Sequence, residues 1–311
     1  VEGLSLHMRS SEINNQQLRG IFANKTVYPL NDGTTFTMFY FNDKWNYASL
    51  HGLDYDTVNM AYFESKDNAD SNFTMKTLFE ESLKSVCQPE EFYNSLDQTK
   101  FYTFGFRNVK FHLFGEIYGC GNNVWQITNN PCLIKSQEPV IITYNKMIEN
   151  NYNAIDNLYN KKEVNFGYIL RENNKPTILV ESELFVKIRK FLYDKTLIDE
   201  IKNYGVNRVK YIIIKNAILP NWDVFLKIFP QFNTQITAII EKIKHLISIM
   251  MEKEKATSDE ETNLCCMLLA DYKKISSNTI KNKEMEKNLF DLCYRNKYIF
   301  NYYNLLKDEL K

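Results

Sequence analysis

Two basic side chains, Lys187 and Arg189, flank Ile188 and have the charge needed to bind a phosphate group. Ammonium and guanidinium groups bind phosphate through charge-assisted hydrogen bonds. The same pair is equally compatible with the solvated face of a helix. The sequence leaves both interpretations open.

The cysteines and histidines lack the spacing of a metal site. No Cys-x-x-Cys pair and no His-x-x-x-His spacing occurs among the six cysteines and four histidines. The pattern is typical of free thiols in a reducing compartment, which predicts a cytoplasmic protein with no structural zinc. The six are Cys87, Cys120, Cys132, Cys265, Cys266 and Cys293.

The composition limits the possible partners. The 311 residues include 38 basic and 38 acidic side chains, so the formal net charge is zero. A dedicated nucleic-acid binder usually carries a basic excess, because phosphate contacts supply most of its affinity. No apolar run reaches the roughly 18–20 residues that span a bilayer, and the N-terminal residues lack the order of a signal peptide.

The first two-thirds of the chain predict short strands with intervening helices. Residues 34–41 and 44–50 are β-prone runs around Asn42-Asp43, a hairpin pattern that begins directly after Asp32-Gly33. Helices are predicted near 74–85, with Thr74 as N-cap, and near 145–159. Further strands are predicted at 101–106, 110–114, 124–127, 140–143, 167–171 and 177–180.

The last third changes to a helical period. Apolar residues recur at three- and four-residue spacing over 184–198, 236–250, 264–275 and 284–306, which favours amphipathic helices. The short run 209–214 is compatible with a strand or with a helical turn. We therefore predict an α+β domain over 1–195 followed by an all-α domain over 196–311.

Several segments together resemble the phage-type RNA ligases and their relatives in large DNA viruses, which attach a nucleotide to an active-site lysine. The resemblance implies a nucleotidyltransferase-like fold, with an ATP-grasp-type antiparallel sheet. The segments are Leu18-Arg19-Gly20, the hairpin after Asp32-Gly33, residues 166–171 (Phe-Gly-Tyr-Ile-Leu-Arg), residues 187–189 (Lys-Ile-Arg) and residues 229–232 (Phe-Pro-Gln-Phe).

The resemblance also implies that the nucleophile is missing. The first motif of the family is Lys-x-Asp-Gly, and this chain has Leu30 in place of the lysine before Asp32 and Gly33. An unprotonated lysine amine must attack the α-phosphate, and leucine offers no lone pair. Lys25 and Lys44 are the possible substitutes. A lysine preceding residues 1–3 (Val-Glu-Gly) would complete a second version of the motif, but the hairpin favours the first placement.

Two further catalytic positions are altered. The third motif ends in a glutamate and is matched to 101–106, where Gly105 replaces the carboxylate. The fourth motif, Glu-Gly, appears as Phe166-Gly167, and its loss removes an oxygen ligand for Mg²⁺. The fifth, Lys-x-Lys, appears as Lys187-Ile188-Arg189. The candidate nucleotide- or phosphate-binding residues are therefore Asp32, Gly33, Arg171, Lys187 and Arg189, with no catalytic residue and no metal ligand.

These observations predict a catalytically degenerate, RNA-ligase-like viral protein in the host cytoplasm or the virion. It would act as a subunit of an assembly with other proteins and would need no cofactor. One alternative is an active ligase or nucleotidyltransferase that uses ATP, Mg²⁺ and an unrecognised lysine. Another is a module that binds RNA without catalysis.

Overall fold

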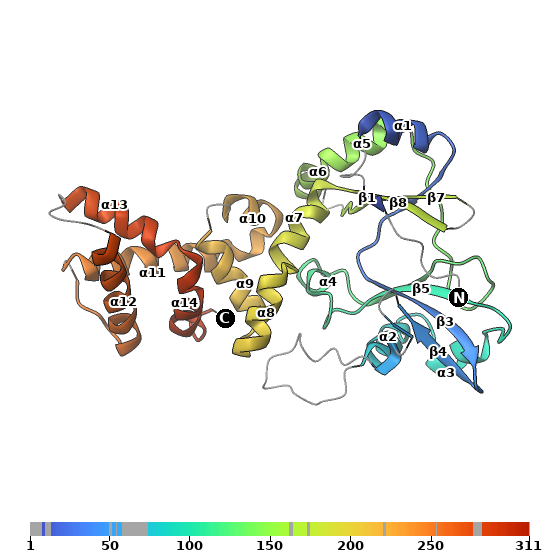
Figure 1. Cartoon of the computed structure of the whole chain (residues 1–311), viewed down its shortest axis with the longest axis horizontal. Coiled ribbons are helices and arrows are strands. Elements are labelled where there is room, and N and C mark those ends of the chain that lie inside the picture. Colours follow the sequence, from blue (N-terminus) through green and yellow to red (C-terminus); the bar gives the residue numbers. More distant parts are fainter. Residues whose placement is uncertain are drawn as a thin grey trace. The chain divides into compact units, whose positions relative to one another are not determined.

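The chain divides into two compact units, Val1–Lys202 and Asn203–Lys311. The computed structural model describes residues 8–9, 14–49, 52–53, 55–57, 74–161, 164–172, 175–219, 222–252, 254–275 and 282–310. The alternative motif at residues 1–3 lies outside these ranges. The N-terminal unit contains two sheets and the C-terminal unit is helical (Figure 1), which confirms the prediction of a mixed α+β chain.

The first sheet has the strand order β1-β8-β7-β2, in which only the β1–β8 pair is parallel. One face packs against helices α1 and α5 through an apolar cluster that includes Leu18, Met147 and Leu170. The opposite face carries the alternate residues of β7 and β8. The strands are β1 (Met8–Arg9), β2 (Thr26–Pro29), β7 (Gly167–Glu172) and β8 (Lys175–Glu181), and the helices are α1 (Asn15–Phe22) and α5 (Tyr144–Tyr152).

The second sheet is antiparallel, with the order β4-β3-β5-β6. The predicted hairpin is confirmed: Asn42 and Asp43 both have positive φ (51° and 57°), as a two-residue hairpin turn requires. Phe36 and Phe104 are among the residues that pack under α2 and α3. The elements are β3 (Thr34–Phe41), β4 (Lys44–Ala48), β5 (Tyr102–Arg107), β6 (Asn123–Gln126), α2 (Met75–Leu83) and α3 (Pro89–Asn94).

The remaining elements of the N-terminal unit are mostly short helices. Thr74 caps α2 as predicted, because its hydroxyl accepts a hydrogen bond from Thr77 N at 3.2 Å. Ser182 caps α7 in the same way, through Phe185 N at 3.2 Å. These elements are η2 (Tyr55–Thr57), α4 (Leu113–Ile117), α6 (Ala154–Lys161) and α7 (Glu183–Leu192), with α8 (Lys195–Tyr204) crossing the boundary between units.

Two predicted strands are wrong. Residues 110–114 form a turn that leads into α4, because Asn108 bonds locally: its side chain accepts from Lys110 N, and its N–H donates to His112 Nδ1. Residues 140–143 are irregular, although Val140 N donates to Val27 O at 2.8 Å. The ambiguous run 209–214 is helical, since it lies within α9 (Arg208–Ala217).

The C-terminal unit consists of helices in its described residues. Helix α11 fills its interior with Ile236, Ile243 and Leu246, the periodic residues that predicted it. Its other elements are α10 (Trp222–Ile228), η5 (Pro230–Phe232), α11 (Asn233–Met250), α12 (Asp259–Ile275), α13 (Asn282–Cys293), η6 (Asn296–Tyr298) and α14 (Ile299–Leu306). None of the described helices combines the length and apolarity needed to cross a bilayer.

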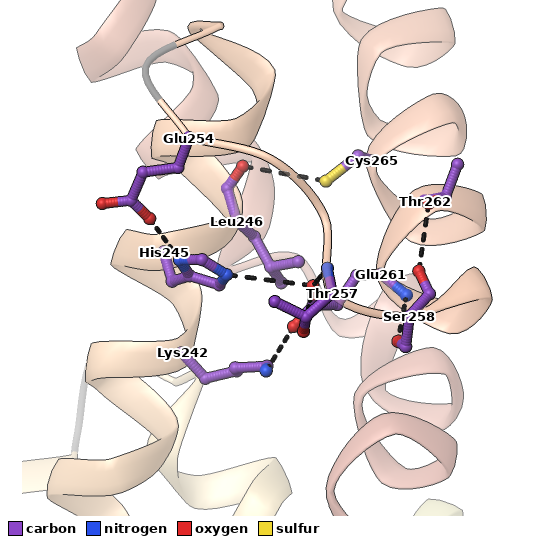
Figure 2. Close-up of polar contacts among 9 residues, drawn as sticks. All are labelled: Lys242, His245, Leu246, Glu254, Thr257, Ser258, Glu261, Thr262 and Cys265. Atoms are coloured by element: carbon purple, nitrogen blue, oxygen red, sulfur yellow. Dashed lines mark hydrogen bonds and ion pairs between the residues drawn. The ribbon is translucent and has the colours of Figure 1, made fainter.

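A buried carboxylate joins α11 to the start of α12 (Figure 2). Glu261 is fully buried and forms an ion pair with Lys242, and it accepts hydrogen bonds from Thr257 N and Oγ1 at 2.6 and 2.9 Å. His245 lies between Glu254 and Glu261. Burial raises the pKa of Glu261, but the hydrogen bonds from Lys242 and Thr257 outweigh it and lower the pKa to about 2.

Candidate functional site: a cavity between the two sheets

A cavity of about 220 Å³ lies in the N-terminal unit, where residues of both sheets meet. Its wall is formed by the segment before β3, by β6, by the outer face of β7 and β8, and by α7. The lining residues are Leu30, Asn31, Asp32, Gly33, Thr35, Trp125, Ile127, Gln137, Ile169, Arg171, Leu179, Glu181, Phe185 and Arg189.

The segment before β3 brings Leu30 and Asp32 to this cavity. Leu30 N donates a hydrogen bond to Gly167 O at 2.8 Å, which ties the segment to the first sheet just before β3 joins the second. The Leu30 side chain is half-buried rather than part of the core. No lysine is among the described residues that line the cavity. A leucine therefore occupies the wall where the resemblance implies a nucleophile.

Asp32 is a buried carboxylate, with 8% of its surface exposed. Burial raises the pKa of Asp32 to about 6, although Arg107, the N–H of Gly33 and Arg189 each lower it. One carboxylate oxygen, Oδ2, has no hydrogen-bond partner. Asp32 is thus a group whose charge changes between mildly acidic and neutral pH inside the cavity.

Trp125 explains the two glycines nearest to it. A Cβ on Gly105 would lie 2.3 Å from the indole ring, and one on Gly33 would lie 2.6 Å from it and 2.5 Å from Phe106 O. The indole therefore fills the space over both residues. A carboxylate at position 105 would require Trp125 to move, so the ring and the glutamate of the third motif are mutually exclusive here.

Phe166 is core rather than cavity wall. It is 6% exposed and makes edge contacts with Phe114 and Phe185, at ring-centroid distances of 5.0 and 5.5 Å. Gly167 after it has φ +122°, a conformation that side chains rarely adopt, and a Cβ there would lie 2.2 Å from Val180 O. The glycine of the fourth motif keeps its structural role, while an aromatic ring fills the position of the glutamate.

Arg171 reaches the cavity from β7 and is held by neighbouring side chains. Its Nη2 donates to Gln137 Oε1 at 2.9 Å, and its guanidinium lies over the Tyr28 ring at 4.2 Å. Only 2% of its surface is exposed. Burial lowers the pKa of Arg171 from its ordinary value, an effect that Tyr28 opposes. The guanidinium remains a cation at any physiological pH.

Arg189 forms a two-pronged ion pair with Glu181. The distances are 2.8 Å from Nη1 to Oε1 and 3.1 Å from Nη2 to Oε2, and the Glu181 side chain is only 8% exposed. Lys187 does not line the cavity. Residues two apart on a helix point in different directions, whereas residues two apart on a strand share a face. The Lys-x-Arg spacing on α7 therefore brings only its second member to the cavity.

The sequence interpretation missed Glu181, Gln137 and Trp125. Strand alternation would have indicated Glu181, because Leu179 and Glu181 face the cavity while Ile178 and Val180 face α1 and α5. Gln137 lies in an irregular segment and gave no such signal. Trp125 lies in a correctly predicted strand, but its contact with two glycines is a tertiary feature.

The donor set of the cavity does not fit a divalent cation. Mg²⁺ requires several oxygen ligands in octahedral geometry. The carboxylates among the described lining residues are Asp32 and Glu181, and Glu181 is paired with Arg189, so the cavity offers fewer oxygen ligands than the cation requires. Within the described part of the chain, no three His, Cys, Asp or Glu residues gather as a metal site would require.

The fold is that of an α+β chain with a cavity between a mixed sheet and an antiparallel sheet, and the described residues that line it include no lysine. The chain is distantly homologous to African swine fever virus proteins named "Putative RNA-ligase". It is 26% identical over 275 residues to the protein of strain Badajoz 1971 Vero-adapted, with 74% of this chain and 59% of the relative covered.

Two other isolates give the same result. The identity is 26% over 275 residues for isolate Tick/South Africa/Pretoriuskop Pr4/1996, and 27% over 274 residues for isolate Tick/Malawi/Lil 20-1/1983. The chain covers 59% and 58% of these relatives, so it spans about three fifths of their length. No protein-family model matches the chain.

Proposed function

We propose that this chain is a catalytically inactive, RNA-ligase-like viral protein with a nucleotidyltransferase-like domain, and that it serves as a subunit of a larger assembly. The observation that carries the proposal is the presence of Leu30, and of no described lysine, in the wall of the cavity beside Asp32 and Gly33. Covalent nucleotidyl transfer through lysine needs an amine at the α-phosphate. An aliphatic side chain cannot supply it.

The two substitute lysines do not offer a better geometry. Lys25, which directly precedes β2, forms an ion pair with Glu172. Lys44 begins β4 opposite Phe41 at the exposed hairpin. Neither lines the cavity. An enzyme that used either one would have to rearrange the hairpin or the β2–β7 pair.

The altered metal position points in the same direction. Phe166 packs between two aromatic rings. Of the cavity carboxylates, Glu181 is paired with Arg189 and Asp32 has a raised pKa. Nucleotidyl transfer with Mg²⁺ would require oxygen ligands near the phosphates. The loss of three separate requirements favours an inactive relative over an enzyme with a displaced nucleophile.

The assembly role follows from the loss of chemistry and is the less specific part of the proposal. The two compact units would act as separate domains, with the boundary near residues 195–202. The partners would be other proteins, in the virion or the host cytoplasm. An RNA-binding module is the second candidate, because Arg171 and Arg189 both line the cavity.

The test is covalent labelling. Purified protein is incubated with α-labelled ATP, and separately with α-labelled GTP, in the presence of Mg²⁺, and is then resolved on a denaturing gel. We expect no labelled band. A band that survives denaturation and is lost in acid would mean that a lysyl-nucleotide forms, and would overturn the proposal. Mapping that adduct would then identify the nucleophile.

A further inference from the structure

The cavity between the sheets has a mixed wall, in which six apolar residues alternate with seven polar or charged ones among the described lining residues. The apolar part is contributed by Leu30, Trp125, Ile127, Ile169, Leu179 and Phe185. Its volume of about 220 Å³ lies below the ~300–1,000 Å³ of sites for drug-sized ligands. A flat ring compound fits such a space better than an extended polyphosphate chain.

The charges of the cavity cancel. The lining residues include two arginines, Arg171 and Arg189, and two carboxylates, Asp32 and Glu181. With Asp32 ionised, the sum is zero. A phosphate-binding site needs uncompensated positive charge, or backbone N–H groups directed at the ligand.

Each guanidinium group already has an acceptor, although the Nε of Arg171 is buried without one. Arg189 donates a hydrogen bond from Nη2 to Glu181 Oε2, and its Nη1 lies 2.8 Å from Oε1, so its charge is already paired with a carboxylate. Arg171 uses Nη2 on Gln137 and its flat face on Tyr28. An incoming phosphate would have to displace the buried Glu181 carboxylate from Arg189. That carboxylate would then be left without its counter-charge, which is costly in a buried position.

We propose that Glu181 determines the ligand specificity of this cavity: by occupying Arg189 it excludes nucleotides, and the cavity takes an uncharged nucleobase or nucleoside. This inference rests on the proposed function, because it concerns the same cavity. It goes beyond the proposed function, because a protein that had lost only its covalent chemistry would still bind the phosphate groups of a nucleotide.

The remaining polar groups suit an uncharged ring with donors and acceptors. Thr35 is a neutral hydrogen-bonding side chain in the wall, and the Asp32 carboxyl can accept a hydrogen bond from a ring N–H or an amino group. The Gln137 amide is already bonded at both ends, to Arg171 and to Pro29 O. Trp125, which is 9% exposed, contributes an aromatic side chain to the same wall. Aromatic surfaces stack with bases of any sequence.

The probes are adenosine, guanosine and their 5′-monophosphates, titrated calorimetrically at pH 7.5 into the full chain. We expect at least one nucleoside to bind about tenfold or more tightly than its monophosphate. A shift of the Trp125 indole N–H signal in the NMR spectrum locates the binding in this cavity. Equal or tighter binding of both monophosphates, or no nucleoside binding at millimolar concentration, would overturn the inference.

The variant Glu181→Gln keeps the shape of the side chain and frees the charge of Arg189. We expect the affinity for the monophosphates to rise at least about tenfold, while the affinity for nucleosides changes less than about twofold. Glu183→Gln is the matched control. Glu183 does not line the cavity between the sheets, although it lines a second cavity that Glu181 also borders. Its substitution removes the same charge, so phosphate affinity should not change. A gain in Glu183→Gln equal to that in Glu181→Gln would contradict the specific role.

A second variant covers the case in which Glu181→Gln does not fold. Asp32→Asn also leaves the cavity with one excess positive charge and should also increase monophosphate affinity at pH 7.5. No increase in either folded variant would overturn the inference. The result is separable from the labelling test: a lysyl-nucleotide would refute inactivity, whereas nucleoside selectivity is measured without any covalent step.

Discussion

Replacing Asp32 by asparagine should stabilise the protein at neutral pH. Burial raises the pKa of this carboxyl from 3.8 to about 6 in the folded chain. Because the folded state then binds more protons than the unfolded state between these values, the stability that Asp32 contributes is present at low pH and is lost as pH rises from about 4 to 6. Asparagine has the shape of the protonated acid and does not ionise.

The magnitude follows from the rise of the Asp32 pKa from 3.8 to about 6. At 1.36 kcal/mol per unit, the ionised Asp32 lowers the free energy of unfolding by about 3 kcal/mol at pH 7.5. At pH 4 the same linkage gives less than about 1 kcal/mol. Asp32→Asn should therefore raise the free energy of unfolding by up to about 3 kcal/mol at pH 7.5, with little effect at pH 4.

The assay is urea denaturation of both proteins across pH 4–8. Two of the three tryptophans, Trp45 and Trp125, lie in the N-terminal unit, so a Trp222→Phe background reports that unit by fluorescence. Asp308→Asn, at an exposed position, controls for the change in net charge. A variant that is less stable than its parent at pH 7.5, or a difference that does not depend on pH, would refute the reasoning.

Three further changes test other parts of the structure. Phe166→Ala should lower the free energy of unfolding by about 3–5 kcal/mol, because it empties a buried aromatic contact, while the exposed Phe41→Ala should cost much less in the same urea titration. Gly105→Ala should destabilise the protein and alter the fluorescence of Trp125, because the new methyl group collides with the indole ring. An unchanged emission spectrum and an unchanged unfolding midpoint would show that the ring is not held there. Glu261→Gln should lower the free energy of unfolding by about 3 kcal/mol at neutral pH. The folded pKa of Glu261 is about 2, so the ionised carboxylate stabilises the protein above its usual pKa of 4.5, and this stabilisation is lost as pH falls toward 2. A thermal midpoint equal to the parent's at pH 7 would count against the buried ion pair.

Local patterns predicted the elements but not the contacts between them. The hairpin at Asn42-Asp43 and helix α11 follow from turn chemistry and apolar period, so both could be read from neighbouring residues. The strand predicted at 110–114 is wrong because Asn108 bonds to the residues that follow it. Amino-acid composition alone gives little indication that an asparagine side chain will compete with the backbone for these hydrogen bonds.

In the candidate site, too, the residues could be predicted from local patterns but the contacts between them could not. Asp32, Gly33, Arg171 and Arg189 line one cavity, while Lys187 does not. Leu30, which replaces the lysine of the first motif, is half-buried in the cavity wall. The pairing of Arg189 with Glu181 joins a helix to the strand before it, and a single sequence gives no indication of which acceptor a guanidinium will find.

The cavity is expected to form no covalent nucleotide adduct, and the intact mass of the purified protein after incubation with ATP or GTP and Mg²⁺ tests this directly. We expect an unchanged mass for the parent chain, and also for Leu30→Lys, because Phe166 and the Glu181–Arg189 pair leave no site for metal or phosphate. An increase of one nucleotidyl group in the parent chain would mean that the protein is an active nucleotidyltransferase. An increase in Leu30→Lys alone would show that only the nucleophile has been lost.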